Sequence, residues 1–266
     1  MNEALEIVAR TDPGLVREHN EDVVFANPVR GLVILADGMG GYNAGEVASG
    51  IAISFLASVL ETAFFDPVQD DMSSDIIGRP STSLCIAESI ELANTAIYNA
   101  SLSESQYSGM GTTLVMGLFF NNQITVAHIG DSRLYLLRDG QLVVMTHDHS
   151  LLQEQIDLGM TTVEEARFAQ NRNLVTRALG VDLAVEAEIH EYDVLPGDIY
   201  LFCSDGLNDM LLDEEIHLTL QTLSDNLELA AEHLIQMAND NGGRDNVSVI
   251  LVKVLQSFPE QTDGGE

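Results

Sequence analysis

Hydrophobic positions along the first third of the chain switch from the period of a strand to that of a helix. Residues 31–36 (GLVILA) form a continuous apolar run that ends at Asp37-Gly38, which predicts a strand buried on both faces. From Asn43 the spacing becomes helical and predicts a helix of about four turns. A second helix is predicted through apolar positions at Ile86, Ile90, Ala93 and Ile97.

The remainder of the chain is mostly strand-like. Asp139-Gly140 separates two β-branched or apolar runs and predicts a hairpin, because both residues tolerate positive φ. Asp225 and Glu228 resemble a capping pair that begins a helix. The predicted strands cover residues 112–120, 123–129, 134–138, 142–145, 183–192, 198–203 and 247–254. Residues 66–82 are acidic and predict a surface loop between helices, residues 149–168 have a helical but irregular pattern, and residues 257–266 predict a frayed tail.

No stretch of the chain has the composition of a linker between domains. We therefore expect a single α+β domain over residues 1–256, followed by a disordered tail at 257–266. The 45% of hydrophobic residues in a chain of 266 is enough to form a sizeable core.

The charge balance excludes whole classes of partner. Eleven Lys and Arg against 42 Asp and Glu leave a net charge of −31, and Lys253 is the single lysine. A nucleic-acid binder needs a basic face to release counterions, and a surface that docks on anionic lipid needs one as well. We expect neither kind of partner.

The two cysteines and the apolar runs indicate the compartment. Cys85 and Cys203 are too few for a disulfide framework, and both lie in apolar runs, which predicts buried, reduced thiols. The start of the chain has no basic and apolar signal pattern, and the apolar runs are shorter than the roughly 20 residues that span a bilayer. We expect a cytoplasmic protein that is not embedded in a membrane.

Carboxylates recur where predicted strands begin or end. Asp37, Asp131 and Asp205 follow apolar runs, and Asp22 and Asp245 precede them. A carboxylate beside a dry core costs several kcal/mol unless it is paired or binds a cation. Oxygen ligands that converge from several strand ends suit Mg²⁺ or Mn²⁺. Each Asp taken singly has a simpler interpretation as a turn or cap residue, and the recurrence favours the metal site.

Four of the few arginines lie near these acidic motifs. Arg17 is the best candidate to bind a phosphate through its guanidinium fork. Arg133, Arg177 and Arg244 are better explained as partners of neighbouring carboxylates.

Spacing excludes several other chemistries. A cysteine phosphatase needs Arg six residues after Cys, but that position holds Asp209 after Cys203 and Glu91 after Cys85. The chain has no Walker A motif, and Gly109-Met110-Gly111 predicts a tight turn rather than a dinucleotide site. Cys and His do not have zinc spacing, and His19 and His149 are interpreted as hydrogen-bonding residues.

Eight motifs follow one another along the chain, namely RTDPGLVREHNED (10–22), ADGMGG (36–41), GMGTTL (109–114), HIGDSRLYLLRDG (128–140), THDHS (146–150), NLVTRALG (173–180), CSDGLNDM (203–210) and GGRDNVSVILV (242–252). Taken as an ordered set, they resemble the PP2C family of metal-dependent Ser/Thr protein phosphatases. The match spans about residues 8–254, and the ordered set is far more specific than any one motif.

The resemblance implies a fold and a reaction. The fold is a sandwich of two central antiparallel β-sheets flanked by α-helices on both sides, with the site at one edge between the sheets. The reaction is attack on phosphoserine or phosphothreonine by a water that two Mn²⁺ or Mg²⁺ ions activate. Residues from about 151 to 172 match a mobile flap beside the site.

The resemblance also implies a role for each site residue. Asp37 bridges the two ions and the Gly38 carbonyl binds one of them. Arg17 binds the substrate phosphate. The remaining metal-binding positions are Glu21 and Asp22 through water, Asp205 and Asp245 at the second ion, and Asp131 and Asp209 at a third, more weakly bound ion.

One position departs from many eukaryotic relatives. They carry His directly after Asp-Gly, as a proposed proton donor to the leaving group, whereas this chain has Met39, as bacterial relatives often do. Met cannot donate a proton, so we expect the donor to be a water near Asp131.

Three functions follow in order of preference. The first is a phosphoprotein phosphatase, which we expect to be a monomer that acts on phosphorylated proteins including a cognate Ser/Thr kinase. The second is a catalytically silent relative that binds a kinase or phosphoprotein, which the intact set Asp37, Asp205 and Asp245 disfavours. The third is a Ca²⁺-binding module, but the chain has no EF-hand loop.

Overall fold

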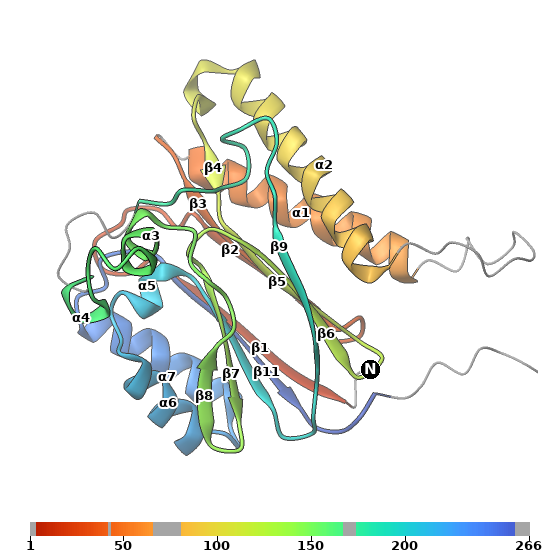
Figure 1. Cartoon of the computed structure of the whole chain (residues 1–266), viewed down its shortest axis with the longest axis vertical. Helices are drawn as coiled ribbons and strands as arrows, with labels where there is room; N and C mark the ends of the chain where they lie inside the picture. Colours follow the sequence, from red (N-terminus) through yellow and green to blue (C-terminus); the bar gives the residue numbers. More distant parts are fainter. Residues whose placement is uncertain (1–3, 42–43, 66–80, 167–173, 259–266) are drawn as a thin grey trace, which may run out of the picture.

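Two antiparallel β-sheets packed face to face form the centre of the molecule, with helices on both outer faces (Figure 1). This computed structural model describes residues 4–41, 44–65, 81–166 and 174–258. The predicted fold class is therefore confirmed.

Each sheet draws strands from distant parts of the chain, and every pairing within it is antiparallel. The five-stranded sheet has the order β1 (Leu5–Asp12), β11 (Val247–Val254), β10 (Ile199–Cys203), β7 (Arg133–Arg138) and β8 (Gln141–Val144). The six-stranded sheet has the order β2 (Asp22–Asn27), β3 (Leu32–Met39), β5 (Leu114–Phe120), β6 (Gln123–Ile129) and β9 (Glu188–Asp193), with β4 (Gly111–Thr112) paired to the end of β3.

The helices form two groups on opposite outer faces and a third near the edge of the sandwich (Figure 1). The long helices α1 (Ala44–Phe65) and α2 (Thr82–Ser103) cover the six-stranded sheet, with a short 3-10 turn at Ser105–Tyr107. On the five-stranded sheet lie α5 (Asp205–Asn208), α6 (Asp213–Thr222) and α7 (Leu227–Asp240). Two short helices follow β8, namely α3 (Leu151–Asp157) and α4 (Val163–Ala166).

Strands between two apolar layers explain the continuous apolar runs of the sequence. In β3, Ile34 faces helices α1 and α2, whereas its neighbours Val33 and Leu35 face the other sheet. In β11, Leu251 faces helix α7 and Val252 faces the other sheet. Because both faces of these strands are buried, apolar residues replace the usual alternation with polar ones.

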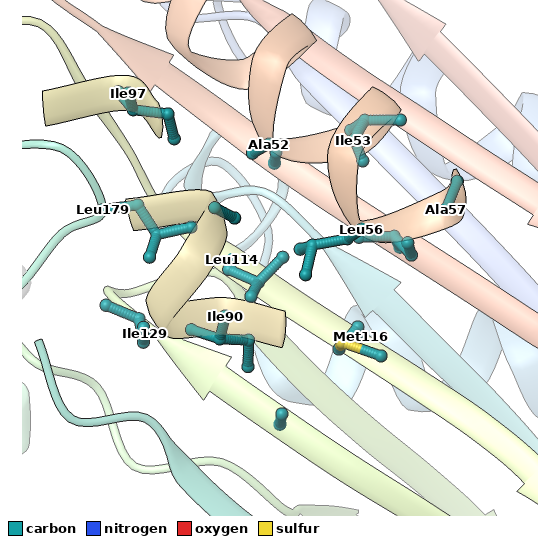
Figure 2. Packing of buried hydrophobic residues seen from close by; sticks show 14 of the residues in the cluster. Ala52, Ile53, Leu56, Ala57, Ile90, Ile97, Leu114, Met116, Ile129 and Leu179 are labelled. Atoms are coloured by element: carbon teal, nitrogen blue, oxygen red, sulfur yellow. The ribbon is translucent and has the colours of Figure 1, made fainter. Parts of the chain in front are cut away.

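Helices α1 and α2 pack on the six-stranded sheet through small and branched side chains. Figure 2 shows Leu56 of α1 and Ile90 of α2 beside Leu114 and Met116 of β5. Leu114, Met116 and Leu56 are fully buried. The predicted pattern through Ile86, Ile90, Ala93 and Ile97 is confirmed as the buried face of α2.

Helix α1 is longer than predicted. It spans 22 residues rather than about four turns. Its segment Ala44–Phe64 is long and apolar enough, by length and composition, to cross a membrane, which corrects the expectation that no apolar stretch is long enough. In this fold, however, Ala48, Ala52 and Leu56 of the helix are buried against the sheet.

Several predicted boundaries are wrong. The strand predicted at residues 112–120 is interrupted at Thr113, and the one predicted at 183–192 begins only at Glu188. Helix α7 is capped by Asn226 rather than Asp225, because the Asn226 side chain accepts a hydrogen bond from Leu229 N. The hairpin turn at Asp139-Gly140 is confirmed, with positive φ at both residues.

The segment 257–266, predicted as a tail, includes one residue that belongs to the core. Phe258 is buried and packs edge-on against Phe119 between the sheets, with ring centroids 6.4 Å apart. Residues 259–266 lie outside the described residues, as do 66–80 of the predicted loop and 167–172 of the predicted flap. Cys203 is buried as predicted, but Cys85 is only half-buried, and both thiols are free.

Candidate metal centre

Five aspartates reach one edge of the sandwich because of where their strands begin and end. Asp22 opens β2 and lies opposite Asp37, near the end of β3, in the antiparallel register. Asp131 and Asp205 each stand two residues beyond the ends of β6 and β10. Asp245 stands two residues before β11, which pairs antiparallel with β10. Strands of both sheets therefore deliver carboxylates to the same edge.

Asp22 ties the two sheets together and keeps one oxygen unused. Its Oδ2 accepts hydrogen bonds of 2.7 Å from Ser204 Oγ, directly after β10, and from Ser248 Oγ of β11, so both donors come from the side of the five-stranded sheet. Its Oδ1 is buried and has no hydrogen-bond partner among the described residues. A buried carboxylate oxygen without a donor is costly, and a cation would satisfy it.

Burial shifts the pKa of two buried carboxyls of the site upward. Asp22 is 5% exposed and Asp131 is 6% exposed. Burial raises the pKa of Asp22 to about 6, although the hydrogen bonds from Ser248 and Ser204 oppose the shift. Burial also raises the pKa of Asp131 to about 7, with a further contribution from the nearby charge of Asp148. Low dielectric disfavours the charged form of each group.

The pKa values of Asp37 and Asp205 are raised by burial and by the charges of neighbouring carboxylates. Burial raises the pKa of Asp37 well above its usual value, and the charges of Asp22 and Asp205 raise it further. For Asp205 burial again acts first, followed by the charges of Asp131 and Asp209. The charges of Asp22, Asp131 and Asp245 act on both Asp37 and Asp205, so these two residues lie at the centre of the acidic cluster.

The loop that carries Glu21 is fixed by two polar contacts. Asn246 Oδ1 accepts a hydrogen bond from Glu21 N at 2.8 Å, and Asn246 Nδ2 donates to the carbonyl of His19. Glu21 Oε1 accepts from Gly45 N at the beginning of α1. Burial raises the pKa of Glu21, while the Gly45 hydrogen bond and the charge of Arg17 lower it.

Gly38 stands where no side chain fits. A Cβ at this position would come within 2.1 Å of the Gly45 carbonyl oxygen and 2.7 Å of that of Glu21. The backbone beside it is held by Thr113, whose N–H donates to the Asp37 carbonyl and whose Oγ1 accepts from Asp37 N. Thr113 Oγ1 also contacts Ser132 Oγ at 2.8 Å, so one threonine links the Asp37 and Asp131 segments.

Arg17 is the cation of the site. Its Nη2 donates to Asp245 Oδ2 at 2.6 Å, and its side chain is 50% exposed. The hydrogen bond to Asp245 is the main cause that raises the Arg17 pKa. The guanidinium therefore stands at the edge of the acidic cluster with half of its surface open to solvent.

The other arginines divide as their predicted roles suggest, with one exception. Arg133 makes a fork with Asp148, through Nε and Nη2 at distances from 2.7 to 3.1 Å. Arg177 lies 3.9 Å from Glu188, which confirms a carboxylate partner. Arg244 is exposed and makes no ion pair with any residue in the described part of the chain, so its predicted pairing is wrong.

A histidine pair beside the Gly130-Asp131 turn forms a hydrogen-bond cluster. His128, His149 and Glu188 place possible ligand atoms within 4.8 Å of one another. His149 Nδ1, however, accepts from Gly130 N, so Nε2 carries the proton and donates to Glu188 Oε1 at 3.1 Å. The ring nitrogens are thus already used within the protein. This agrees with the prediction that His149 is a hydrogen-bonding residue.

The structure brings all nine predicted site residues to one region. Asp209 follows α5, and its N–H donates to the Asp205 carbonyl at 2.8 Å. The analysis of the sequence missed the polar residues that support the carboxylates. These are Thr113, Ser204, Asn246 and Ser248. Ser204 and Asn246 adjoin predicted site residues directly, and this adjacency is the signal that could have identified them.

The donor set fits a hard divalent cation. It consists of carboxylate oxygens and the backbone at Gly38, with no sulfur or ring nitrogen among the candidate ligands. Mg²⁺ and Mn²⁺ prefer such oxygen ligands. The unpartnered Asp22 Oδ1 and the raised pKa values of Asp37 and Asp205 mark a cluster that a cation would stabilise.

Comparison with known families agrees with this geometry. A family model described as protein phosphatase 2C matches residues 17–251. The chain belongs to the protein phosphatase 2C family. The resemblance inferred from the ordered motifs is therefore confirmed.

Bacterial members of the protein phosphatase 2C family resemble the chain over nearly its whole length. The serine/threonine protein phosphatase PstP of Mycobacterium tuberculosis is 40% identical over 258 residues, which cover 97% of this chain and 46% of PstP. The chain thus spans about half the length of that relative. The serine/threonine phosphatase stp of Listeria monocytogenes is 37% identical over 250 residues, covering 92% of this chain and 94% of stp.

A solved member of the protein phosphatase 2C family contains metal. The crystal structure of the PstP catalytic domain in complex with two manganese ions has a TM-score of 0.81 and 39% identity, and covers 95% of this chain and 99% of that one. A likeness of this degree extends the agreement from sequence to the arrangement of both sheets.

Proposed function

We propose that the chain is a metal-dependent protein phosphatase that hydrolyses phosphoserine and phosphothreonine in proteins. The observation that carries this proposal is the convergence of buried carboxylates from both sheets beside a half-exposed arginine. Membership of the protein phosphatase 2C family, and the names of the bacterial relatives, support the same reaction.

The proposed metal-binding set joins both sheets. We assign Asp37, Gly38, Asp205 and Asp245 to two Mn²⁺ or Mg²⁺ ions. Glu21 and Asp22 lie in or next to the same coordination shell, and Asp131 and Asp209 are assigned to a third, weaker site. Bound ions would stabilise negative charge on phosphoryl oxygens as Lewis acids and would lower the pKa of a nearby water, which is the chemistry that phosphomonoester hydrolysis needs.

The protein contributes position and charge. Ser204 and Ser248 hold Asp22 by two hydrogen bonds to Oδ2, while Oδ1 has no hydrogen-bond partner among the described residues. Asp245 holds Arg17 at the edge of the cluster, where the remaining guanidinium N–H groups can bind phosphate oxygens. Charge on the equatorial oxygens would then meet a preorganised donor.

A covalent cysteine mechanism is disfavoured by Cys203. This thiol is fully buried, and burial raises its pKa to about 12. The thiolate is the nucleophilic form, and it is scarce at neutral pH when the pKa is so high.

The proposal extends to the context of the enzyme. We propose a single catalytic domain over residues 1–256 with a flap at about 151–172, acting as a cytoplasmic monomer. Its substrates are phosphorylated Ser and Thr proteins, among them a cognate Ser/Thr kinase. The net charge of −31 supports the absence of a nucleic-acid or anionic-membrane partner.

The test is hydrolysis of a phosphothreonine peptide with Mn²⁺, with Mg²⁺ and with EDTA. We expect turnover with either ion and none with EDTA. Asp205→Ala should remove turnover, whereas Glu232→Gln, at an exposed position of α7, should not.

Two results would contradict the proposal. Turnover that survives chelation or Asp205→Ala would remove the metal mechanism. A silent binding protein would instead bind the phosphopeptide without releasing phosphate under any metal condition.

A further inference from the structure

A pocket opens directly beside the candidate metal centre. It has a volume of about 400 Å³, and Asp131, Asp205 and Asp209 of the candidate metal centre are among its lining residues. The part of the pocket lined by Leu152 and Ile156 of α3 together with Met210, Leu212 and Asp213 is called the side pocket.

The side pocket has apolar walls that the fold leaves accessible. Leu152 and Ile156 stand four residues apart and so share one face of α3. Both are half-buried, and Leu212 is 44% exposed. In the same segment Leu207 is buried in the core, whereas Leu211 packs in the core and also lines the pocket.

A series of hydrogen bonds links four residues at and beside the side pocket. Asp148 accepts the Nε and Nη2 fork of Arg133, and Arg133 Nη1 donates to Tyr135 Oη at 3.2 Å. Tyr135 Oη in turn donates to Asp213 Oδ1 at 3.1 Å. Three guanidinium N–H groups of Arg133 are thus used within the protein, and its charge is paired with Asp148, so this part of the pocket is a poor second phosphate site. Its accessible surface suits a side chain without charge.

The distance from the metal centre limits which side chain can reach the pocket. Asp205 and Leu212 are joined by the four residues of α5 and a short extension. Because Asp209 N donates to the Asp205 carbonyl, the helical rise of about 1.5 Å per residue extends to Asp209. Three further steps of at most about 3.6 Å each then keep the Cα atoms of Asp205 and Leu212 within roughly 17 Å of each other. An extended substrate covers that distance in about five residues.

We infer that the side pocket is a specificity subsite for an aliphatic side chain of the phosphoprotein, within about five residues of the phosphorylated Ser or Thr. This inference rests on the proposed phosphatase function and goes further, because it defines the class of substrate sequence. Three observations support the inference. Asp131 and Asp205 line the same pocket, apolar side chains form part of its walls, and the Arg133 guanidinium is paired with Asp148.

The test is a set of phosphothreonine peptides that carry one variable residue at each position from five before to five after the phosphothreonine, in an Ala and Ser background. The variable residue is Leu, Ala, Arg or Glu. The assay measures kcat/KM with Mn²⁺ at high ionic strength, which screens long-range charge. We expect one position at which Leu exceeds Ala by about tenfold, since burying a leucine side chain supports a ratio of that size.

Two pocket variants show whether the preference comes from this surface. Ile156→Gln and Leu212→Gln should each bring the ratio of Leu to Ala peptides towards one. The ratio is internal to each variant, so a general loss of activity cancels. Leu218→Gln is the matched control, because Leu218 is an exposed leucine of α6 that does not line the pocket. It should retain the ratio.

The outcomes separate this inference from the function on which it rests. No hydrolysis of any peptide would overturn the proposed function. Hydrolysis of all peptides without a preference for Leu would overturn the subsite alone. So would a preference that survives both pocket variants, or a position that responds to them but favours Arg over Leu.

Discussion

Each buried carboxylate at this site lowers the stability of the metal-free fold, and a bound cation offsets that loss. Asp205 is the clearest case, since burial and the charges of Asp131 and Asp209 raise its pKa well above the usual value. The side chain resists ionisation, yet a divalent ion requires the ionised form as ligand. Function and stability therefore make opposite demands on the same residue.

Asp205→Asn should separate these two demands. The amide has the shape of the carboxyl without its charge, so we expect the metal-free variant to unfold at the same temperature as wild type or higher. With Mn²⁺, phosphatase activity should fall at least about 100-fold, because outer partners of a metal alone are worth about 10- to 100-fold. Thermal unfolding in EDTA and peptide hydrolysis in Mn²⁺ are the measurements.

Glu232→Gln is the control for this pair of measurements, since it removes a charge at an exposed position far along α7. It should change neither quantity. A metal-free Asp205→Asn protein that is clearly less stable than wild type would contradict the repulsion inferred here.

The stacked histidines beside the Gly130-Asp131 turn make stability depend on pH. The rings of His128 and His149 lie 4.9 Å apart, and burial lowers the pKa of each. Above the unfolded value of about 6.5 both states hold neutral histidine, so the contribution is complete. As pH falls below it, the unfolded chain takes up protons that the fold resists, and stability is lost.

His128→Phe keeps the ring but not the titration, and it removes the hydrogen bond between Nε2 and the His147 carbonyl. We expect wild type to be the more stable protein at pH 7.5, by about 1 kcal/mol, and the gap to narrow towards pH 5.5. Thermal unfolding at several pH values measures it. A gap that widens in acid would mean that Glu188 stabilises the protonated ring instead.

Helix α5 has to approach β11 closely for Asp205 and Asp245 to meet. A Cβ on Gly206 would lie 1.9 Å from the Asn246 carbonyl oxygen. Backbone cannot yield as a side chain does, so the two segments would be pushed apart. Gly50 of α1 offers the contrast, because a Cβ there would meet nothing within 4 Å.

The same substitution should therefore have opposite effects at these two glycines. Gly206→Ala should lower the free energy of unfolding by about 1–3 kcal/mol and weaken activity. Gly50→Ala should raise it by about 0.5–1 kcal/mol, because alanine favours a helix interior. Urea unfolding of both variants measures the free energies, and a stable Gly206→Ala protein would refute the close approach.

The sequence predicts the strands that are buried on both faces well, but it predicts partly exposed strands and the ends of helices poorly. Residues 31–36 and 247–254 are apolar on both faces, so length and β-branching identify them. Strand β1 has polar residues such as Glu6 and Arg10 on its accessible positions and gave no clear pattern. Asn226 caps helix α7 because its side chain, rather than that of Asp225, accepts a hydrogen bond from Leu229 N.

For the site, the sequence predicts the ligands but not their supports. Asp37 and Asp205 stand out as charges after apolar runs. Ser248 lies inside an apolar strand, and its hydrogen bond to Asp22 spans 226 positions of the chain. Only packing of the two sheets brings such residues together, so composition and spacing cannot reveal the contact.

The charge of the whole molecule should influence which substrates it attracts. A net charge of −31 creates a negative field that favours basic partners at low ionic strength. We expect the inactive Asp205→Asn variant to bind a Lys- and Arg-rich phosphopeptide about tenfold more weakly when salt rises from about 0.02 to 0.3 M. Fluorescence anisotropy of labelled peptides measures this affinity. An affinity that is independent of salt would contradict the prediction, and a peptide with Ala in place of the basic residues is the control.

We infer that the two sheets bring their carboxylates, with the serine and asparagine side chains that support them, to one edge of the molecule. There the carboxylates bind divalent ions. The most direct measurement is anomalous diffraction at the manganese edge from crystals grown in Mn²⁺. The account predicts two strong peaks among Asp37, Asp205 and Asp245, within coordination distance of their oxygens. Crystals in which these side chains stand apart, with no anomalous peak among them, would contradict it.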